Sequence, residues 1–348
     1  MPKPASCAVR DAGLLLLLTL GLSIAVLEIL GQTRLGDVDA LLFFRATTRI
    51  VKEDVDHRNL PGSKPGINSD GIRSLREPER VRGQDFNIVF LGDSYVYGMG
   101  LHYRETVPYQ LEKILREEVG PQIKVLNFGW ISSSPVLSLR LLRDLGAKYK
   151  PDLVLLGLDM TDFRDDLLYS NIIAGKRLFA LKKVVPATLV AVNLALERSR
   201  LLSPLRQALF GVPSERYFAT NQPLEESAPY LETTLDALAG IRDFSDEELG
   251  APFALFVFPR NFQYSDAESP GSWEKGLYQP LGPYVLEPFR FFEERADRLP
   301  YPVFSLLEAF RDTDVSPHCF RDDPHWNPAG AEIAARAIST RLRAAGLL

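Results

Sequence analysis

Short apolar runs alternate with amphipathic segments along most of this chain, and their order predicts a fold. Five runs are apolar almost throughout, which is typical of strands that are buried on both faces of a parallel sheet. They lie at residues 87–91, 122–127, 152–158, 252–258 and 302–306. Because helical patterns separate them, we expect an α/β domain, a three-layer α/β/α sandwich with a five-stranded parallel sheet.

The helical segments carry their own boundary signals. Two of them open with an N-cap residue followed by proline at the first helical position, at Ser134-Pro135 and at Asn327-Pro328. The expected helices cover residues 106–119, 135–148, 226–243 and 286–297, with a last helix from residue 327 onward.

The N-terminus has a different pattern. Ala12–Leu30 is an apolar run of about 19 residues, adequate for a membrane span, and Lys3 and Arg10 precede it. No Ala-x-Ala site follows the run, which favours an uncleaved anchor over a cleaved signal peptide. Since the basic residues should stay in the cytoplasm, the rest of the chain is expected outside it.

These patterns divide the chain into three parts. Residues 1–35 are expected to form a cytoplasmic tail and transmembrane anchor, residues 36–66 a stalk, and residues 67–348 the main domain. The regular alternation breaks at about 165–225, where apolar and basic segments predict a helical insertion over the functional edge of the sheet.

Composition excludes several functions. The net charge is −5 at pH 7 and no basic patch with interleaved aromatic residues occurs, so nucleic acid is not an expected partner. Two cysteines are too few for a disulfide framework or a structural zinc site. Asp162, Asp165 and Asp166 cluster without a nearby histidine or cysteine, so we interpret them as solvated loop carboxylates. No metal and no cofactor is expected.

Two short segments carry the chemistry. Ser94 follows the first strand within Gly92-Asp93-Ser94, at the carboxyl end of a parallel strand, where open α/β sheets place their active sites. Near the other end, RDDPHWNPAG puts two acids ahead of a histidine at residues 321–330. Together the segments supply a serine nucleophile, a histidine base and a carboxylate that orients the base.

These segments resemble the SGNH hydrolase superfamily, also called GDSL esterases and lipases, over about residues 67–340. GDSYVYGMG is similar to the family's Gly-Asp-Ser block, which implies that Ser94 is the nucleophile. The last segment is similar to the Asp-x-x-His block, which implies His325 as base and favours Asp322 over Asp323 as its partner. INSDGIR and HWNPAG resemble a membrane-anchored bacterial branch of the superfamily.

The middle blocks depart from the family pattern. Ser132 stands where the family has glycine, and Met160-Thr161-Asp162 stands where it has Gly-Asn-Asp. The resemblance implies an oxyanion hole made by the amides of Ser94 and Ser132, with Thr161 in place of the asparagine. A threonine hydroxyl is a shorter donor than a carboxamide, and the loss of one oxyanion donor slows such enzymes by about 10²–10³. Thr161 is equally compatible with a purely structural role.

The sequence therefore predicts a slow or specialised serine hydrolase, acting outside the cytoplasm on an acyl or acetyl ester. The expected partners are an ester-bearing small molecule, lipid or glycan, and the membrane through the N-terminal helix. An O-acyltransferase that modifies an envelope glycan is an alternative, because the same triad serves both reactions. A non-catalytic binding domain is a third interpretation, which the altered middle blocks favour.

Overall fold

Five parallel strands form one sheet in the order β2-β1-β3-β4-β5. Every strand that the sequence predicts is present, with boundaries shifted by one or two residues. The strands are β1 (Phe86–Gly92), β2 (Ile123–Gly129), β3 (Leu153–Leu158), β4 (Phe253–Val257) and β5 (Val303–Ser305). The predicted α/β fold with a five-stranded parallel sheet is therefore confirmed.

This computed structural model describes residues 13, 15–26, 66–81, 84–173, 211–213 and 215–348. The described residues within 66–170 and 215–348 belong to one compact unit. Most of the predicted insertion lies outside the described residues; two helices at its borders are described, α6 (Asp162–Ile173) and α10 (Phe218–Asn221).

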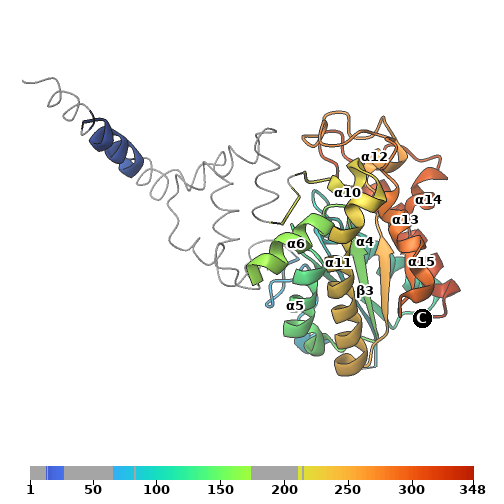
Figure 1. Cartoon of the computed structure of the whole chain (residues 1–348). Coiled ribbons are helices and arrows are strands. Elements are labelled where there is room, and N and C mark those ends of the chain that lie inside the picture. Colours follow the sequence, from blue (N-terminus) through green and yellow to red (C-terminus); the bar gives the residue numbers. More distant parts are fainter. Residues whose placement is uncertain (1–12, 14, 27–65, 82–83, 174–210, 214) are drawn as a thin grey trace, which may run out of the picture. The chain divides into compact units, whose positions relative to one another are not determined.

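Helices pack on both faces of the sheet because both faces are apolar. Side chains of a strand alternate between the two faces. On one face, Ile88 and Phe90 of β1 join a core with α4 (Val107–Glu118) and α15 (Pro328–Ala344). The intervening side chains, Val89 and Leu91, are buried on the other face. There α5 (Pro135–Leu145) packs against α11 (Leu224–Phe244) (Figure 1).

Shorter helices occupy the connections. They are α3 (Ser94–Tyr97), α12 (Asn261–Tyr264), α13 (Glu287–Glu293) and α14 (Leu307–Arg311). The predicted helices at 106–119, 226–243 and 286–297 correspond to α4, α11 and α13, and α15 begins at Pro328 with Asn327 as its N-cap, as predicted.

The strand order determines where a site can lie. The chain leaves β1 for β2 on one side and later reaches β3 on the other side of β1, so the direction of winding reverses there. In open α/β sheets such a reversal opens a crevice at the carboxyl ends of the strands. Ser94 follows β1 and Thr161 follows β3 at that edge, which brings two of the predicted site segments together.

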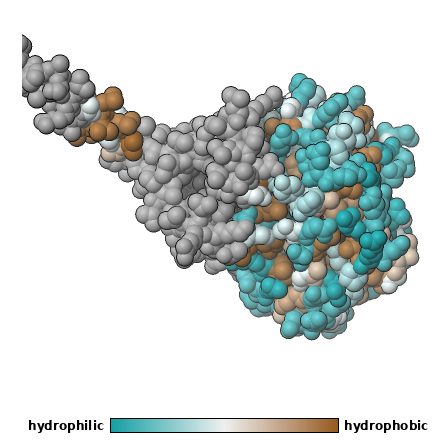
Figure 2. All heavy atoms as spheres, viewed as in Figure 1, coloured by the Kyte–Doolittle hydropathy of each residue, from teal (hydrophilic) through white to brown (hydrophobic). Residues whose placement is uncertain are grey.

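The N-terminal part of the chain is described only at residues 13 and 15–26. Residues 15–26 are helical with exposed leucine side chains, and Figure 2 colours this segment hydrophobic. In the described part of the chain, no helix is both long and apolar enough to cross a bilayer. The remainder of the expected anchor and the stalk at 36–66 lie outside the described residues, so the anchor stays a prediction.

Candidate active site

The turn after β1 holds Ser94 in a tight and strongly determined conformation. A Cβ at Gly92 would lie 2.4 Å from Cγ2 of Val96, so this position requires glycine. The Asp93 carboxylate then accepts a hydrogen bond from the Tyr95 amide at 2.9 Å and caps α3. Ser94 is the first residue of that helix, and it is 8% exposed. The local sequence thus places its hydroxyl at the edge of the crevice.

His325 meets this serine from the far end of the chain. Its Nε2 lies 2.8 Å from the Oγ of Ser94, and its Nδ1 is hydrogen-bonded to the carboxylate of Asp323. Partial burial alone would raise the pKa of Asp323, but the hydrogen bonds from His325 outweigh it, and the pKa lies below its ordinary value. This is the arrangement of a Ser-His-Asp triad, with the carboxylate on the ring nitrogen remote from the serine.

The expectation that Asp322 orients His325 was wrong by one residue. Asp322 is exposed, and its carboxylate packs over Gly271, where an added Cβ would lie 2.0 Å from Oδ1. The carboxylate of Asp323 instead turns toward His325. It accepts a hydrogen bond from the His325 amide at 2.9 Å and is also bonded to the imidazole ring. This local aspartate turn is what brings Asp323 to the histidine.

The segment around His325 is fixed by its neighbours. The Tyr95 hydroxyl donates to the carbonyl of Pro324 at 2.9 Å, and its ring lies 5.0 Å from the imidazole. Two residues after the histidine, the Asn327 side chain accepts hydrogen bonds from the first turn of α15 and donates to the carbonyl of Pro317 at 2.6 Å. Hydrogen bonds to the residues before and after it therefore hold His325 in place.

Ser132 adopts a backbone conformation that glycine favours. Its φ is 57°, a left-handed conformation that favours glycine and strains a serine. Its carbonyl accepts a hydrogen bond from Tyr169 at 2.8 Å, which helps to hold the turn. Among the described residues, the amides of Ser94 and Ser132 have no backbone partner. Both amides are thus available as oxyanion donors.

Thr161 does not offer its hydroxyl to an oxyanion. The side chain is buried, and its Oγ1 donates to the Oδ2 of Asp159 at 2.6 Å. A hydroxyl has a single proton to donate, so this bond uses it. The interpretation of Thr161 as a third oxyanion donor is corrected in favour of the structural alternative.

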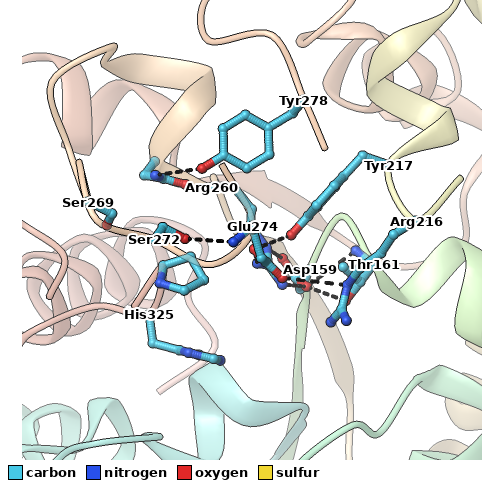
Figure 3. A network of polar contacts seen from close by, with 12 residues as sticks. Asp159, Thr161, Arg216, Tyr217, Arg260, Ser269, Ser272, Glu274, Tyr278 and His325 are labelled. Carbon is cyan, nitrogen blue, oxygen red and sulfur yellow. Dashed lines mark hydrogen bonds and ion pairs between the residues drawn. The ribbon is translucent and has the colours of Figure 1, made fainter. Parts of the chain in front are cut away.

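A buried ion network, absent from the sequence-based prediction, lies beside the triad (Figure 3). Arg260, 1% exposed, donates from Nε and Nη2 to the two oxygens of Asp159, each at 2.6 Å. Its Nη1 donates to Glu274 at 2.7 Å, and the Tyr217 hydroxyl donates to the same carboxylate. The guanidinium also lies 5.1 Å from the ring centre of Tyr95, so the network touches the residue next to the nucleophile.

The pKa values of the buried carboxyl groups at this edge are shifted in opposite directions. Burial would raise the pKa of Asp159, but the charge and hydrogen bonds of Arg260 hold it well below its ordinary value. Burial raises the pKa of Asp93 to about 8, and the charge of Asp159 adds to the effect. Burial likewise raises the pKa of Asp166 to about 7.

The interpretation of the acidic cluster as solvated was wrong for two of its members. Asp162 and Asp166 are buried, and each carboxylate accepts a backbone hydrogen bond, from Asp159 and from Val136 respectively, at 2.9 Å. The acids cap turns instead of facing water. Within the described ranges, no group of three or more histidine, cysteine and acidic side chains is arranged to hold a metal ion.

A small apolar pocket adjoins Ser94 and His325. It encloses no space that a water-sized sphere could occupy. Besides those two residues and Tyr95, it is lined by Gly98, Met99, Leu101, Val107, Trp326 and Ala331. No charged side chain lines this hollow.

No family model and no curated protein matches the sequence. The chain is similar to the psychrotrophic esterase EstA from Pseudoalteromonas sp., with 15% identity and a TM-score of 0.41 over 75% of this chain and 98% of that one. It is similar to the lipase/acylhydrolase from Enterococcus faecalis, with 13% identity and a TM-score of 0.42 over 75% and 96%. It is also similar to AlinE4, an SGNH-hydrolase family esterase, with 17% identity and a TM-score of 0.34 over 76% of this chain and 95% of that one.

Proposed function

We propose that this protein is a serine ester hydrolase of the SGNH type. The observation that carries the proposal is the hydrogen-bonded series Ser94, His325 and Asp323, with 2.8 Å between the serine Oγ and the histidine Nε2. A serine hydroxyl is a weak nucleophile at neutral pH, and this arrangement provides the base and the carboxylate that activate it.

The reaction follows from these positions. Ser94 Oγ attacks the ester carbonyl while its proton passes to Nε2 of His325, and the carboxylate of Asp323 stabilises the imidazolium. Collapse of the tetrahedral intermediate releases the alcohol, which takes the proton from His325 and leaves an acyl group on Ser94. Water then attacks the acyl-enzyme with His325 as base, and the acid and free serine are formed.

The oxyanion hole has fewer donors than the family pattern supplies. We assign it to the backbone amides of Ser94 and Ser132, since the Thr161 hydroxyl is bonded to Asp159. One missing donor lowers the rate by about 10²–10³. The proposed enzyme is therefore slow on simple esters.

The close packing beside the triad supports a short acyl group. Met99, Leu101 and Val107 line the hollow at Ser94 and leave no enclosed space for a long acyl chain, so we propose an acetyl or similarly small acyl group. The location outside the cytoplasm is proposed from the sequence alone, namely from Lys3, Arg10 and the apolar run after them.

The two alternatives differ in what they require. An O-acyltransferase would form the same acyl-enzyme and pass the acyl group to a sugar hydroxyl instead of water, with the same residues in the same roles. A non-catalytic domain would not need an intact serine–histidine hydrogen bond, and the 2.8 Å contact argues against it.

The test compares the full-length chain with Ser94→Ala on 4-nitrophenyl acetate, butyrate and octanoate, with a fluorophosphonate probe as a second readout. We expect hydrolysis of the short esters and probe labelling, both lost in Ser94→Ala with an unchanged melting temperature; the rate should fall by roughly 10⁴-fold or more. Full activity in Ser94→Ala would refute the assignment. Strong labelling with a single burst of 4-nitrophenol and no further turnover in water would favour the transferase.

A further inference from the structure

Trp273 is an exposed aromatic side chain beside the proposed triad. It lies in the loop between α12 and α13 and is 60% exposed, while Ser272 and Glu274 on either side are buried. The other two tryptophans of the chain, Trp130 and Trp326, are 3% and 2% exposed. A single large aromatic ring is thus presented to solvent by a loop whose neighbouring residues are packed.

The loop holds this ring in a fixed place. Glu268 accepts hydrogen bonds from the amides of His318 and Cys319, and the Gly271 amide donates to the carbonyl of Arg321 at 3.0 Å. From the same loop, the Ser269 hydroxyl donates to the backbone carbonyl of Asp323 at 3.2 Å. The exposure of Trp273 therefore does not come from a loose loop, and the loop that carries it is bonded to the residue proposed as the catalytic acid.

Arg216 completes the surface around the ring. Its guanidinium lies 5.7 Å from the ring centre of Trp273 and pairs with Glu274 at 3.6 Å, and its side chain is 41% exposed. Glu274 is in turn held by Arg260 and Tyr217, which Figure 3 shows gathered around it. An aromatic face and an oriented set of N–H donors therefore share one rim.

We propose that Trp273 and Arg216 form a subsite for a sugar ring of an acylated saccharide. The proposal rests on the proposed function, whose substrate class it specifies. The indole face can stack on the C–H face of a pyranose, and the guanidinium can donate to ring hydroxyls or to a sugar carboxylate. The acyl group then lies at Ser94, and this rim takes the alcohol part of the ester. An arginine paired with a carboxylate beside the ring fits a hydroxyl-rich ligand better than a lipid surface.

Binding is tested without turnover, on the full-length Ser94→Ala chain, so failure of the hydrolase proposal is measured separately with 4-nitrophenyl acetate. The probes are an acetylated xylo-oligosaccharide and an acetylated oligogalacturonate, followed by tryptophan fluorescence. Because the other two tryptophans are buried, stacking should shift the emission of Trp273 to the blue, and Trp273→Phe should abolish the shift. A larger affinity for the galacturonate would show that Arg216 binds a carboxylate.

Calorimetry measures the saccharide affinity of variants and distinguishes loss of the sugar site from a general disturbance of the loop. Trp273→Ala should weaken binding about tenfold, the size of one aromatic stacking contact, while Trp273→Phe retains most of it. Arg216→Gln should weaken binding several-fold, and Leu277→Ala, an exposed residue of the same loop, should not.

In the wild-type background, Trp273→Ala should lower kcat/KM for the acetylated saccharide more than for 4-nitrophenyl acetate, because the smaller ester has no sugar ring to stack on the indole. Equal losses on both substrates, no fluorescence shift with either saccharide, or a shift produced by anionic lipid vesicles instead would overturn the proposal.

Discussion

Two carboxylates at the carboxyl edge of the sheet are paired with cationic partners of opposite kinds. Asp159 is sealed in the interior with Arg260, which carries its charge at any physiological pH. Asp323 lies at the rim with its side chain 39% exposed, and its partner His325 is charged only when protonated. The first pair is permanent, and the second changes charge as a proton moves.

This difference separates a pair that supports the fold from a pair that can take part in proton transfer. A buried guanidinium with two carboxylates has no proton to exchange near neutral pH, so the Arg260 network can hold loops together but cannot act as a base. A histidine whose one nitrogen faces a carboxylate and the other a serine can accept and return a proton. Breaking each pair should therefore damage a different property of the protein.

The largest expected effect comes from breaking the rim pair. Asp323→Asn should lower kcat by about 10⁴, because the amide favours the wrong tautomer of His325. Asp322→Asn serves as the matched control and should stay close to wild type, with both variants melting near the wild-type temperature. The kcat for 4-nitrophenyl acetate is measured for both variants. A greater loss of kcat in Asp322→Asn would make Asp322 the residue that orients His325.

Breaking the buried pair should instead lower stability. Arg260→Met leaves the buried Asp159 without a cation, while Glu274 keeps Arg216 at 3.6 Å, and an uncompensated buried charge of this kind costs about 3–5 kcal/mol. Urea unfolding of the single variant and of Arg260→Met/Asp159→Asn measures this. The double variant should recover part of the loss, since the stranded charge of Asp159 is gone. A single variant as stable as wild type would mean that the network does not support the fold.

A third carboxylate, that of the buried Asp166, extends the comparison to pH dependence. Burial raises the pKa of Asp166 from its ordinary 3.8 to about 7. Between these values the unfolded chain has lost this proton and the folded chain keeps it, so stability is fully present below pH 3.8 and falls until about pH 7.

Asp166→Asn should flatten that decline, since an amide oxygen can still accept from the Val136 amide and has no charge to bury. Urea unfolding at several pH values measures the slope, and Glu225→Gln, an exposed acid on α11, should leave it unchanged. A wild-type slope in Asp166→Asn would show that other groups cause the decline.

The sequence predicts the parts of the site that depend on near neighbours. The nucleophile turn at Ser94 and the cap at Asn327 are each formed by contacts within three residues, so their motifs are enough to find them. The choice between Asp322 and Asp323 depended on the conformation of the turn before His325, which the sequence spacing of the residues does not determine. Arg260 and Asp159 are 101 residues apart, and only the pairing of β3 with β4 brings them together.

Thr161 connects the buried network to the predicted oxyanion hole, and it gives the smallest expected effect. Thr161→Val keeps the shape of the side chain and removes a hydrogen bond to a charged carboxylate, worth about 1.5–3 kcal/mol of stability. The rate of acylation by 4-nitrophenyl acetate should change by less than about threefold, whereas loss of a true oxyanion donor lowers it by 10²–10³. A drop of that larger size, with stability intact, would return Thr161 to the oxyanion hole. The expected combination, lower stability with nearly unchanged acylation, would place it with Asp159 and Arg260 in the scaffold.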